Sequence, residues 1–410
     1  MNSQPNRKLI IWILGALTTV SPFSIDMYLP AFSQIAADFG TTPAKISLSL
    51  SSYFIGLALG QMLYGPLLDR FGRKKPLYYG LSIFIVASIA CMQSQSTEAL
   101  IAFRFIQALG GCVAWVGAMT MVRDFFPVEE SAKVFSLLIL ILGVSPLLAP
   151  TVGGYIATTL GWQSIFIMLA VIVFVILMIT FLYLPEGRKP DPSISLKAGP
   201  MLATFLSILK LPQFYTYSFS SAFAFSTLFI YLAGSPVIFM EIFHVSPQTY
   251  GIIFALISVG FIGSSQLNIF LIKRFSSEKI FRVALMCQVI TGFLFLFMVW
   301  NGWLEFYSTV AIFFILLSCL GIINPNGSAL ALAPFTRNVG SASALLGCTQ
   351  IGVAALASSG VGIFNSHDTI PIVGLMVLTS SIALSILMIG QKKIGSAIIT
   401  GSVSPEGAAH

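Results

Sequence analysis

The chain contains twelve long apolar stretches, and this repetition limits the folds that it can adopt. Each holds about 20 or more mostly apolar residues, the length that an α-helix needs to cross a bilayer. The whole chain is 57% hydrophobic and only 9% charged, whereas soluble globular chains carry about 25% charged residues. We therefore predict an all-α membrane protein with twelve transmembrane helices at residues 9–31, 45–68, 76–95, 98–121, 131–157, 162–184, 213–239, 247–272, 280–300, 305–331, 338–364 and 369–391.

The positions of the basic residues predict the orientation of these helices. Of the 21 Lys and Arg residues, only Lys45 falls in a loop on the opposite side and only Arg104 lies well inside a span. By the positive-inside rule both termini are cytoplasmic. The net charge of +7 is therefore explained by topology, and we expect no nucleic-acid partner.

A half-length repeat predicts two similar bundles. A shift of 204 residues places Arg70-Phe71 on Arg274-Phe275, in the loops after the second and eighth spans. Such parallel repeats enclose a central cavity with a substrate site near the midplane of the membrane. The predicted domains are an N-terminal six-helix bundle at 1–185, a cytoplasmic linker at 186–212 that includes an interfacial helix, a C-terminal six-helix bundle at 213–394 and a disordered tail at 395–410.

Two ionisable residues of opposite sign, Asp26 and Arg104, lie inside the predicted spans. A charge at membrane depth is costly and usually functional. At a rise of about 1.5 Å per residue, each lies about 8 Å below the same face of the membrane. Their equal depth places the two side chains where they could meet. We expect both residues to take part in proton coupling. The alternatives are a structural role for Arg104, bonded to carbonyls or Gln107, and a helix-end position for Asp26 near Pro30.

The remaining reactive residue types do not indicate catalysis. The five cysteines lie in apolar runs without metal-ligand spacing, and we interpret them as small buried residues: Cys91, Cys112, Cys287, Cys319 and Cys348. No histidine falls inside a span, so a carboxylate must carry any proton at membrane depth. We expect no metal site, no cofactor other than the proton as coupling ion, and no enzymatic activity.

Five motifs resemble those of one family of transporters. The loop 65–75 resembles the signature of the loop between helices 2 and 3 in the major facilitator superfamily, with Lys74 in place of an arginine. Residues 104–111 and 143–154 resemble motifs of proton-coupled members and antiporters, although the usual Gly-Pro pair is Ser-Pro here. Residues 25–30 and 340–350 resemble the drug:proton antiporters of the bicyclomycin/chloramphenicol-resistance type. The resemblance covers residues 8–392.

This resemblance implies the major facilitator fold and a monomeric, proton-coupled antiporter in the bacterial inner membrane. Its expected partners are membrane lipid and a small-molecule substrate, an amphipathic drug or toxin that competes with the proton for Asp26. The alternative is export of an endogenous metabolite, such as a siderophore or an amino-acid derivative. An uncoupled facilitator or a membrane enzyme is a more remote alternative.

The loop after the second span is the predicted cytoplasmic gate. Asp69 is placed to meet the free N–H groups at the start of helix 11, and Arg73 to pair with Asp124. The resemblance implies the same arrangement, which holds the outward-open state shut. A basic cluster that serves topology alone is the alternative. The predicted gate residues are Gly65, Asp69, Arg70, Gly72, Arg73, Lys74, Arg123 and Asp124.

Helix 5 and a set of polar side chains complete the predicted site. Small residues allow close packing of membrane helices, and prolines kink them. We therefore expect helix 5 to pack closely on its neighbours and to be kinked. The alternative is close packing without a kink. The residues concerned are Gly143, Pro146, Pro150, Gly153 and Gly154. The predicted substrate cavity is lined by polar or aromatic groups inside spans: Tyr28, Gln107, Trp115, Tyr231, Asn324, Asn326 and Gln350.

Overall fold

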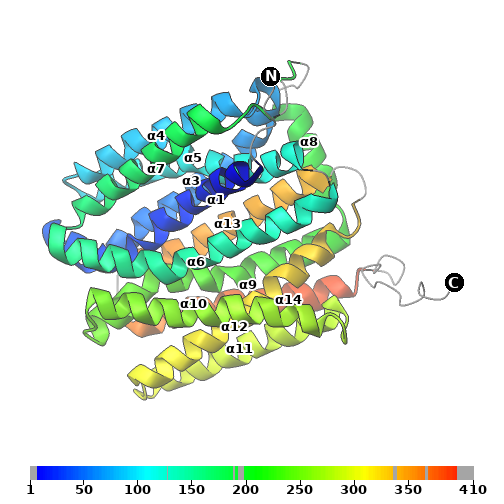
Figure 1. Ribbon diagram of the computed structural model, residues 1–410. Coiled ribbons are helices and arrows are strands. Elements are labelled where there is room, and N and C mark those ends of the chain that lie inside the picture. The colour runs from blue at the N-terminus through cyan, green and yellow to red at the C-terminus, as the bar shows by residue number, and fades with distance from the viewer. Residues whose placement is uncertain are drawn as a thin grey trace. The chain divides into compact units, whose positions relative to one another are not determined.

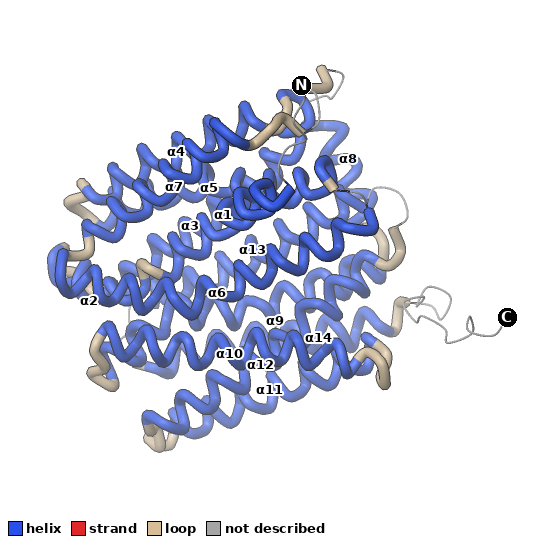
Figure 2. Tube along the Cα trace, viewed as in Figure 1, coloured by secondary structure: helices blue, strands red, loops and turns tan. Residues whose placement is uncertain are grey.

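The computed structural model describes residues 7–126, 128–187, 190–192, 198–335, 339–364 and 368–394. These residues form helices joined by short loops, and no strand occurs among them (Figures 1 and 2). Eleven of the described helical segments are long and apolar enough to cross a membrane. The twelfth long helix, α6 (Val128–Leu160), has 33 residues, and part of its side chains lies outside the described set. The predicted all-α membrane fold is confirmed.

The chain divides into two compact units, the first of which comprises Met1–Leu196, Tyr231–Ser258 and Ser358–Asp368. Within it α3 packs on α5, α5 on α4, α4 on α7, and α1 on α6. Its elements from the first half of the chain are α1 (Arg7–Asp26), η1 (Leu29–Ala31), α2 (Phe32–Asp38), α3 (Pro43–Phe71), α4 (Lys74–Met92), α5 (Thr97–Phe125), α6 and α7 (Gln163–Tyr183).

The second unit comprises Lys197–Ile230, Val259–Ala357 and Thr369–His410. In this unit α11 packs on α12 and on α14. The elements that the second half of the chain supplies to the two units are α8 (Ala198–Leu209), α9 (Pro212–Pro236), η2 (Val237–Ile242), α10 (Pro247–Leu271), α11 (Ser277–Trp300), α12 (Phe306–Leu332), α13 (Val339–Phe364) and α14 (Thr369–Gln391).

The helix starts repeat along the chain as the loop motif predicts. Pro43 opens α3 and Pro247 opens α10, 204 residues later. The starts of α4 and α11, at Lys74 and Ser277, are 203 residues apart. The helix α8 lies within the predicted linker; its position on the membrane surface stays a prediction, as do the domain boundaries. The predicted tail at 395–410 lies outside the described residues.

The first span ends earlier than predicted, at Asp26 instead of residue 31. Pro30 has no N–H to donate to the Asp26 carbonyl four residues before it, and its ring would crowd that carbonyl. The chain continues as a short 3₁₀ turn at Leu29–Ala31 and a second helix at Phe32–Asp38. Asp26 therefore occupies the last position of α1, where the backbone changes direction.

One expectation about the cysteines is wrong. Cys91, Cys112 and Cys319 are buried, but Cys348 is half-buried and Cys287 is exposed. A cysteine on the outer side of a membrane helix meets lipid, which is as apolar as a protein core, so an apolar run does not distinguish the two environments.

Candidate functional site

Arg104 of α5 is fully buried, with an exposed fraction of 0%. Its Nη1 donates to the Ser24 hydroxyl at 2.8 Å and its Nη2 to the Ser24 carbonyl at 3.0 Å. Nη1 also donates to Oε1 of Gln107, one turn along the same helix, at 2.5 Å. Gln107 is held in turn by its own donation to Ser88 at 2.7 Å. Arg104 thus fastens α5 to the last turns of α1.

Aromatic rings surround the same guanidinium. Its central carbon lies 4.2 Å from the ring centroid of Tyr53 and 4.6 Å from that of Tyr28. Such cation–π contacts are stronger where water is excluded. In the described part of the chain no carboxylate pairs with Arg104, and its Nε has no hydrogen-bond partner. The site therefore holds a buried positive charge that is solvated by hydroxyls, amides and π faces alone.

Asp26 and Arg104 do not form the contact that their depth suggested. Ser24 faces Arg104, and Asp26 follows two residues later, which turns its side chain by about 200° around the helix axis. Asp26 is buried, with an exposed fraction of 5%. Among the described residues, no hydrogen bond or ion pair reaches its carboxylate. The direction of a side chain around its helix, and not its depth alone, decides that Ser24 meets Arg104 and Asp26 does not.

The Asp26 carboxylate instead lies within electrostatic range of two tyrosines from the second half of the chain. They are Tyr231 in α9, a predicted cavity residue, and Tyr250 in α10. Both are fully buried. The Tyr250 hydroxyl shares a hydrogen bond of 2.8 Å with Ser235, and Tyr231 stacks on Phe254 at 5.7 Å between centroids. Tyr250 was not predicted, because its one signal in the sequence is a hydroxyl inside an apolar span.

The Gly/Pro-rich part of α6 packs closely on its neighbours, as predicted. A side chain at Gly153 would collide with the backbone carbonyl of Met27, and one at Gly154 would meet the carbonyl of Pro247 at 2.7 Å. From the other side, a side chain at Gly251 would meet the Thr151 backbone at 2.8 Å. We call this contact of α6 with the end of α1 and the start of α10 the glycine seam.

The other residues predicted in helix 5 lie inside α6, which runs without a break through Pro146 and Pro150. Gly143 belongs to the same helix, but its packing is outside the described set. The kink stays a prediction. A hydrogen bond of 2.7 Å from Gln248 to the Thr158 hydroxyl adds a polar contact beside the glycine seam.

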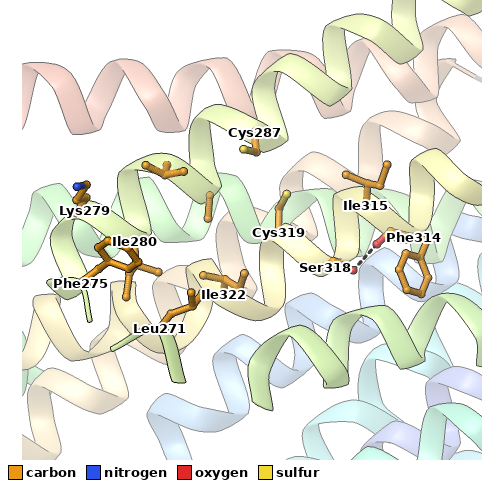
Figure 3. A pocket seen from close by; sticks show the side chains of 12 residues that line it. Leu271, Phe275, Lys279, Ile280, Cys287, Phe314, Ile315, Ser318, Cys319 and Ile322 are labelled. Atoms are coloured by element: carbon orange, nitrogen blue, oxygen red, sulfur yellow. Dashed lines mark hydrogen bonds between the residues drawn. The ribbon is translucent and has the colours of Figure 1, made fainter. Parts of the chain in front are cut away.

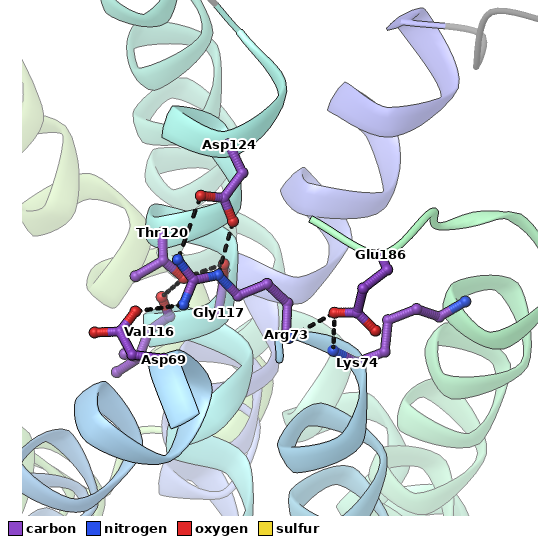
Figure 4. A network of polar contacts seen from close by, with 8 residues as sticks. All are labelled: Asp69, Arg73, Lys74, Val116, Gly117, Thr120, Asp124 and Glu186. Atoms are coloured by element: carbon purple, nitrogen blue, oxygen red, sulfur yellow. Dashed lines mark hydrogen bonds and ion pairs between the residues drawn. The ribbon is translucent and has the colours of Figure 1, made fainter. Parts of the chain in front are cut away.

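The predicted gate contains the expected ion pair between Arg73 and Asp124 (Figure 4). Nε of Arg73 donates to Asp124 at 2.7 Å and Nη1 donates to Asp69 at 2.6 Å. Burial alone would lower the pKa of Arg73, but the carboxylates of Asp124 and Asp69 outweigh burial and raise it. One guanidinium therefore joins the end of α3 to the end of α5.

Glu186, which the sequence analysis did not single out, completes this network. Its carboxylate accepts the backbone N–H groups of Arg73 at 2.6 Å and Lys74 at 3.1 Å, at the free N-terminal end of α4. The next residue, Gly187, lies so near that a side chain there would meet Asp124 at 2.6 Å. The signal for this contact was an acid just past the sixth span, with a glycine after it.

The other gate residues have separate surroundings. Gly72 has φ +83°, a conformation that favours glycine, so the predicted turn is confirmed. Gly65 lies inside α3, where an added Cβ would touch nothing within 4 Å. Arg70 lies over the Phe71 ring and Lys74 over the Tyr78 ring. The side chain of Arg123 is outside the described set, and the contact of Asp69 with the start of helix 11 stays a prediction.

Two of the predicted cavity residues meet in the second unit. Gln350 of α13 donates to Asn324 of α12 at 3.1 Å and to Ser221 of α9 at 3.4 Å. Asn326, two residues after Asn324, faces another side of α12 and donates to Asn268 of α10 at 2.7 Å. This unit therefore offers amides and hydroxyls, which bind uncharged polar groups.

The predicted residues in the first half of the chain do not form a single cluster. Tyr28 and Gln107 contact Arg104. Trp115 is half-buried, about three turns farther along α5, and is not among the side chains that contact Arg104. Its place in the substrate cavity stays a prediction.

Comparisons with known proteins agree with the fold. The family model of the Major Facilitator Superfamily matches residues 14–359. The protein named uncharacterized MFS-type transporter YdgK of Bacillus subtilis is 32% identical over 95% of this chain and 97% of its own. The bicyclomycin resistance protein homolog of Haemophilus influenzae is 28% identical over 94% and 96%. Multidrug resistance protein MdtL of Escherichia coli is 30% identical over 91% and 93%.

Solved structures show the same fold at low sequence identity. A bacterial homolog of the human lysosomal transporter Spinster, in an inward-facing and occupied conformation, is 14% identical with a TM-score of 0.73. The match covers 96% of this chain and 98% of that chain. A D-xylose–proton symporter is 15% identical with a TM-score of 0.69, over 93% and 97%.

Proposed function

Because this chain belongs to the major facilitator superfamily, we propose that it is a proton-driven exporter of small amphipathic drugs or toxins, located in the bacterial inner membrane. Relatives at about 30% identity are named for bicyclomycin and multidrug resistance, which supports the class of cargo. The proposal makes the protein a transporter that couples two fluxes, with Asp26 as the residue that both fluxes use.

The observation that carries this proposal is the position of Asp26. Its carboxylate is buried at the end of α1 without an ion-pair partner among the described residues. A buried carboxylate without a partner favours its neutral, protonated form, and a nearby cationic or polarisable molecule favours the charged form. Proton and cargo therefore compete for one site. Binding of cargo displaces the proton, and binding of a proton displaces the cargo, which is the requirement for exchange.

In this proposal Arg104 acts as a fixed charge and not as the carrier of the proton. Two hydrogen bonds to Ser24 hold its guanidinium in place, two residues from Asp26. An arginine keeps its proton in proteins, so its charge stays constant while that of Asp26 changes. Displacement of the Arg104 side chain would move Ser24 and, with it, the backbone that carries Asp26.

The available driving force is adequate for one proton per cycle. One charge that crosses 100 mV releases about 2.3 kcal/mol, and one pH unit adds about 1.4 kcal/mol. A hundredfold accumulation of a neutral compound requires about 2.7 kcal/mol. In alternating access, the glycine seam and the network around Arg73 would open and close in turn at opposite ends of the first unit.

The proposal is tested by susceptibility and transport measured together. Cells with and without the intact gene are compared against a panel of amphipathic antibiotics, and the purified protein is assayed in proteoliposomes with an imposed pH gradient. We expect lower resistance without the gene and pH-driven movement of the same compounds. Unchanged resistance, with a metabolite accumulating inside the cells, would instead identify an exporter of an endogenous compound.

A further inference from the structure

A groove in the second unit is lined by residues that have no part in the proposed transport site. It runs between the end of α10, the first half of α11 and the middle of α12, and encloses about 450 Å³. Figure 3 shows its lining from close by. Its walls are formed chiefly by Leu271, Ile280, Cys319 and Ile322. This volume falls within the range of small-molecule sites in proteins, about 300–1,000 Å³.

The groove wall offers almost nothing to a polar ligand. Ser318, the one hydroxyl in its lining, donates to the Phe314 carbonyl at 2.7 Å and is thereby occupied. Cys287, Phe314 and Ile315 line the groove and are exposed on helices apolar enough to span a membrane. The open side therefore faces the hydrocarbon of the bilayer, and the groove suits an alkyl chain.

The end of the groove nearest the α10–α11 loop is positively charged. Lys279 is part of the lining, and its Nζ lies 5.2 Å from the ring centroid of Phe275, another lining residue. Exposed Lys273 and Arg274 precede it in the same loop. The acid between them and Lys279, Glu278, is paired with Arg282 at 2.9 Å. Of these three cations only Lys279 is part of the groove lining, and Glu278, next to it in the sequence, is already paired.

We propose that this groove is a binding site for an anionic phospholipid, with one acyl chain along α11 and α12 and the phosphate at Lys279. The apolar wall and the charged mouth match the two ends of such a lipid. A basic residue at the end of a membrane helix is well placed to meet a negative headgroup. Such a lipid would join the α10–α11 loop to α12 from the membrane side.

The test compares two lysines of the same loop. Native mass spectrometry of the full-length protein measures binding of phosphatidylglycerol and of phosphatidylcholine with the same acyl chains. Lys279→Gln is expected to weaken phosphatidylglycerol binding by about fivefold, the effect of one basic side chain at a membrane surface. The matched control, Lys273→Gln, removes the same charge from a side chain outside the groove lining, over Phe270, and is expected to weaken binding much less.

A second variant tests the apolar half of the site. Cys287→Trp places an indole in the groove while keeping every charge, and we expect it to reduce phosphatidylglycerol binding. Helical circular dichroism checks that all variants are folded. Equal losses in the two lysine variants would show diffuse attraction by the loop and overturn the site. Equal binding of both lipids by the unaltered protein, or full binding by Cys287→Trp, would overturn it as well.

Discussion

Arg104 keeps a full charge at membrane depth although, in the described part of the chain, no acid pairs with it. Removal of a partner from a buried charge is costly, because the charge stays behind without compensation. Here the compensation is divided among Ser24, Gln107 and the faces of Tyr28 and Tyr53. No single neighbour balances the charge. The fixed geometry of the guanidinium nitrogens therefore decides whether the hydrogen bonds to Ser24 and Gln107 can all form.

Arg104→Lys is therefore not a conservative change. An ammonium keeps the charge but cannot bond the Ser24 hydroxyl and carbonyl with two separate nitrogens. We expect the free energy of unfolding to fall by about 1.5–3 kcal/mol, the range for a hydrogen bond to a charged group, and transport to be impaired. Thermal unfolding in detergent and a proteoliposome assay measure the two effects. Unaltered stability and transport would mean that charge alone is required.

Glu186 permits a sharper comparison at the residue scale. Glu186→Gln keeps the size of the side chain but removes the negative charge at the start of α4. We expect a loss of about 1 kcal/mol in the free energy of unfolding. The control is Glu98→Gln, which neutralises an exposed acid in the first turn of α5 that makes no hydrogen bond in the described structure. Equal losses in the two variants would contradict the assigned role of Glu186.

At the scale of elements, the glycine seam depends on the absence of side chains. Gly153→Ala would push a methyl group into the Met27 carbonyl, next to Asp26. Overpacking of this kind costs about 1–3 kcal/mol, so we expect lower thermal stability and impaired transport. Gly263→Ala is the control, since α10 has open space at that position. A Gly153→Ala protein as stable and active as the control would show that α6 can move away from its neighbours at the glycine seam without loss of stability or transport.

The elements were predicted better than the contacts between them. Spans of about 20 apolar residues are set by membrane thickness, so helix number and order follow from hydropathy, and a single loop motif was enough to reveal the repeat. The direction of a side chain around its helix was the weak point. For this reason Asp26 was expected to meet Arg104. For the same reason Asn324 and Asn326 were placed in one predicted group, although they face different partners.

Contacts between segments far apart in the chain were harder still. The pairing of Arg73 with Asp124 was predictable because both are charged and follow neighbouring helices. Glu186 and Tyr250 were missed because each lies far along the sequence from the residue that it approaches, Arg73 and Asp26 respectively. Neither residue type is unusual in its own surroundings. Such positions become visible only when the fold brings the helices together.

At the scale of the whole molecule, the two halves supply different chemistry. The first half supplies the buried charged side chains of Asp26 and Arg104. The second half adds the tyrosines near Asp26 and the amides of Asn324 and Gln350. In the proposed function, coupling depends on the carboxylate of Asp26.

The most direct test is therefore transport by an Asp26→Asn variant. The purified protein is reconstituted in proteoliposomes, and uptake of a cargo compound is followed with and without an imposed pH gradient. We predict that the unaltered protein and the control Glu305→Gln, which neutralises an exposed acid, respond to the gradient, whereas Asp26→Asn does not. Uptake by Asp26→Asn that rises with the pH gradient as in the unaltered protein would contradict the account.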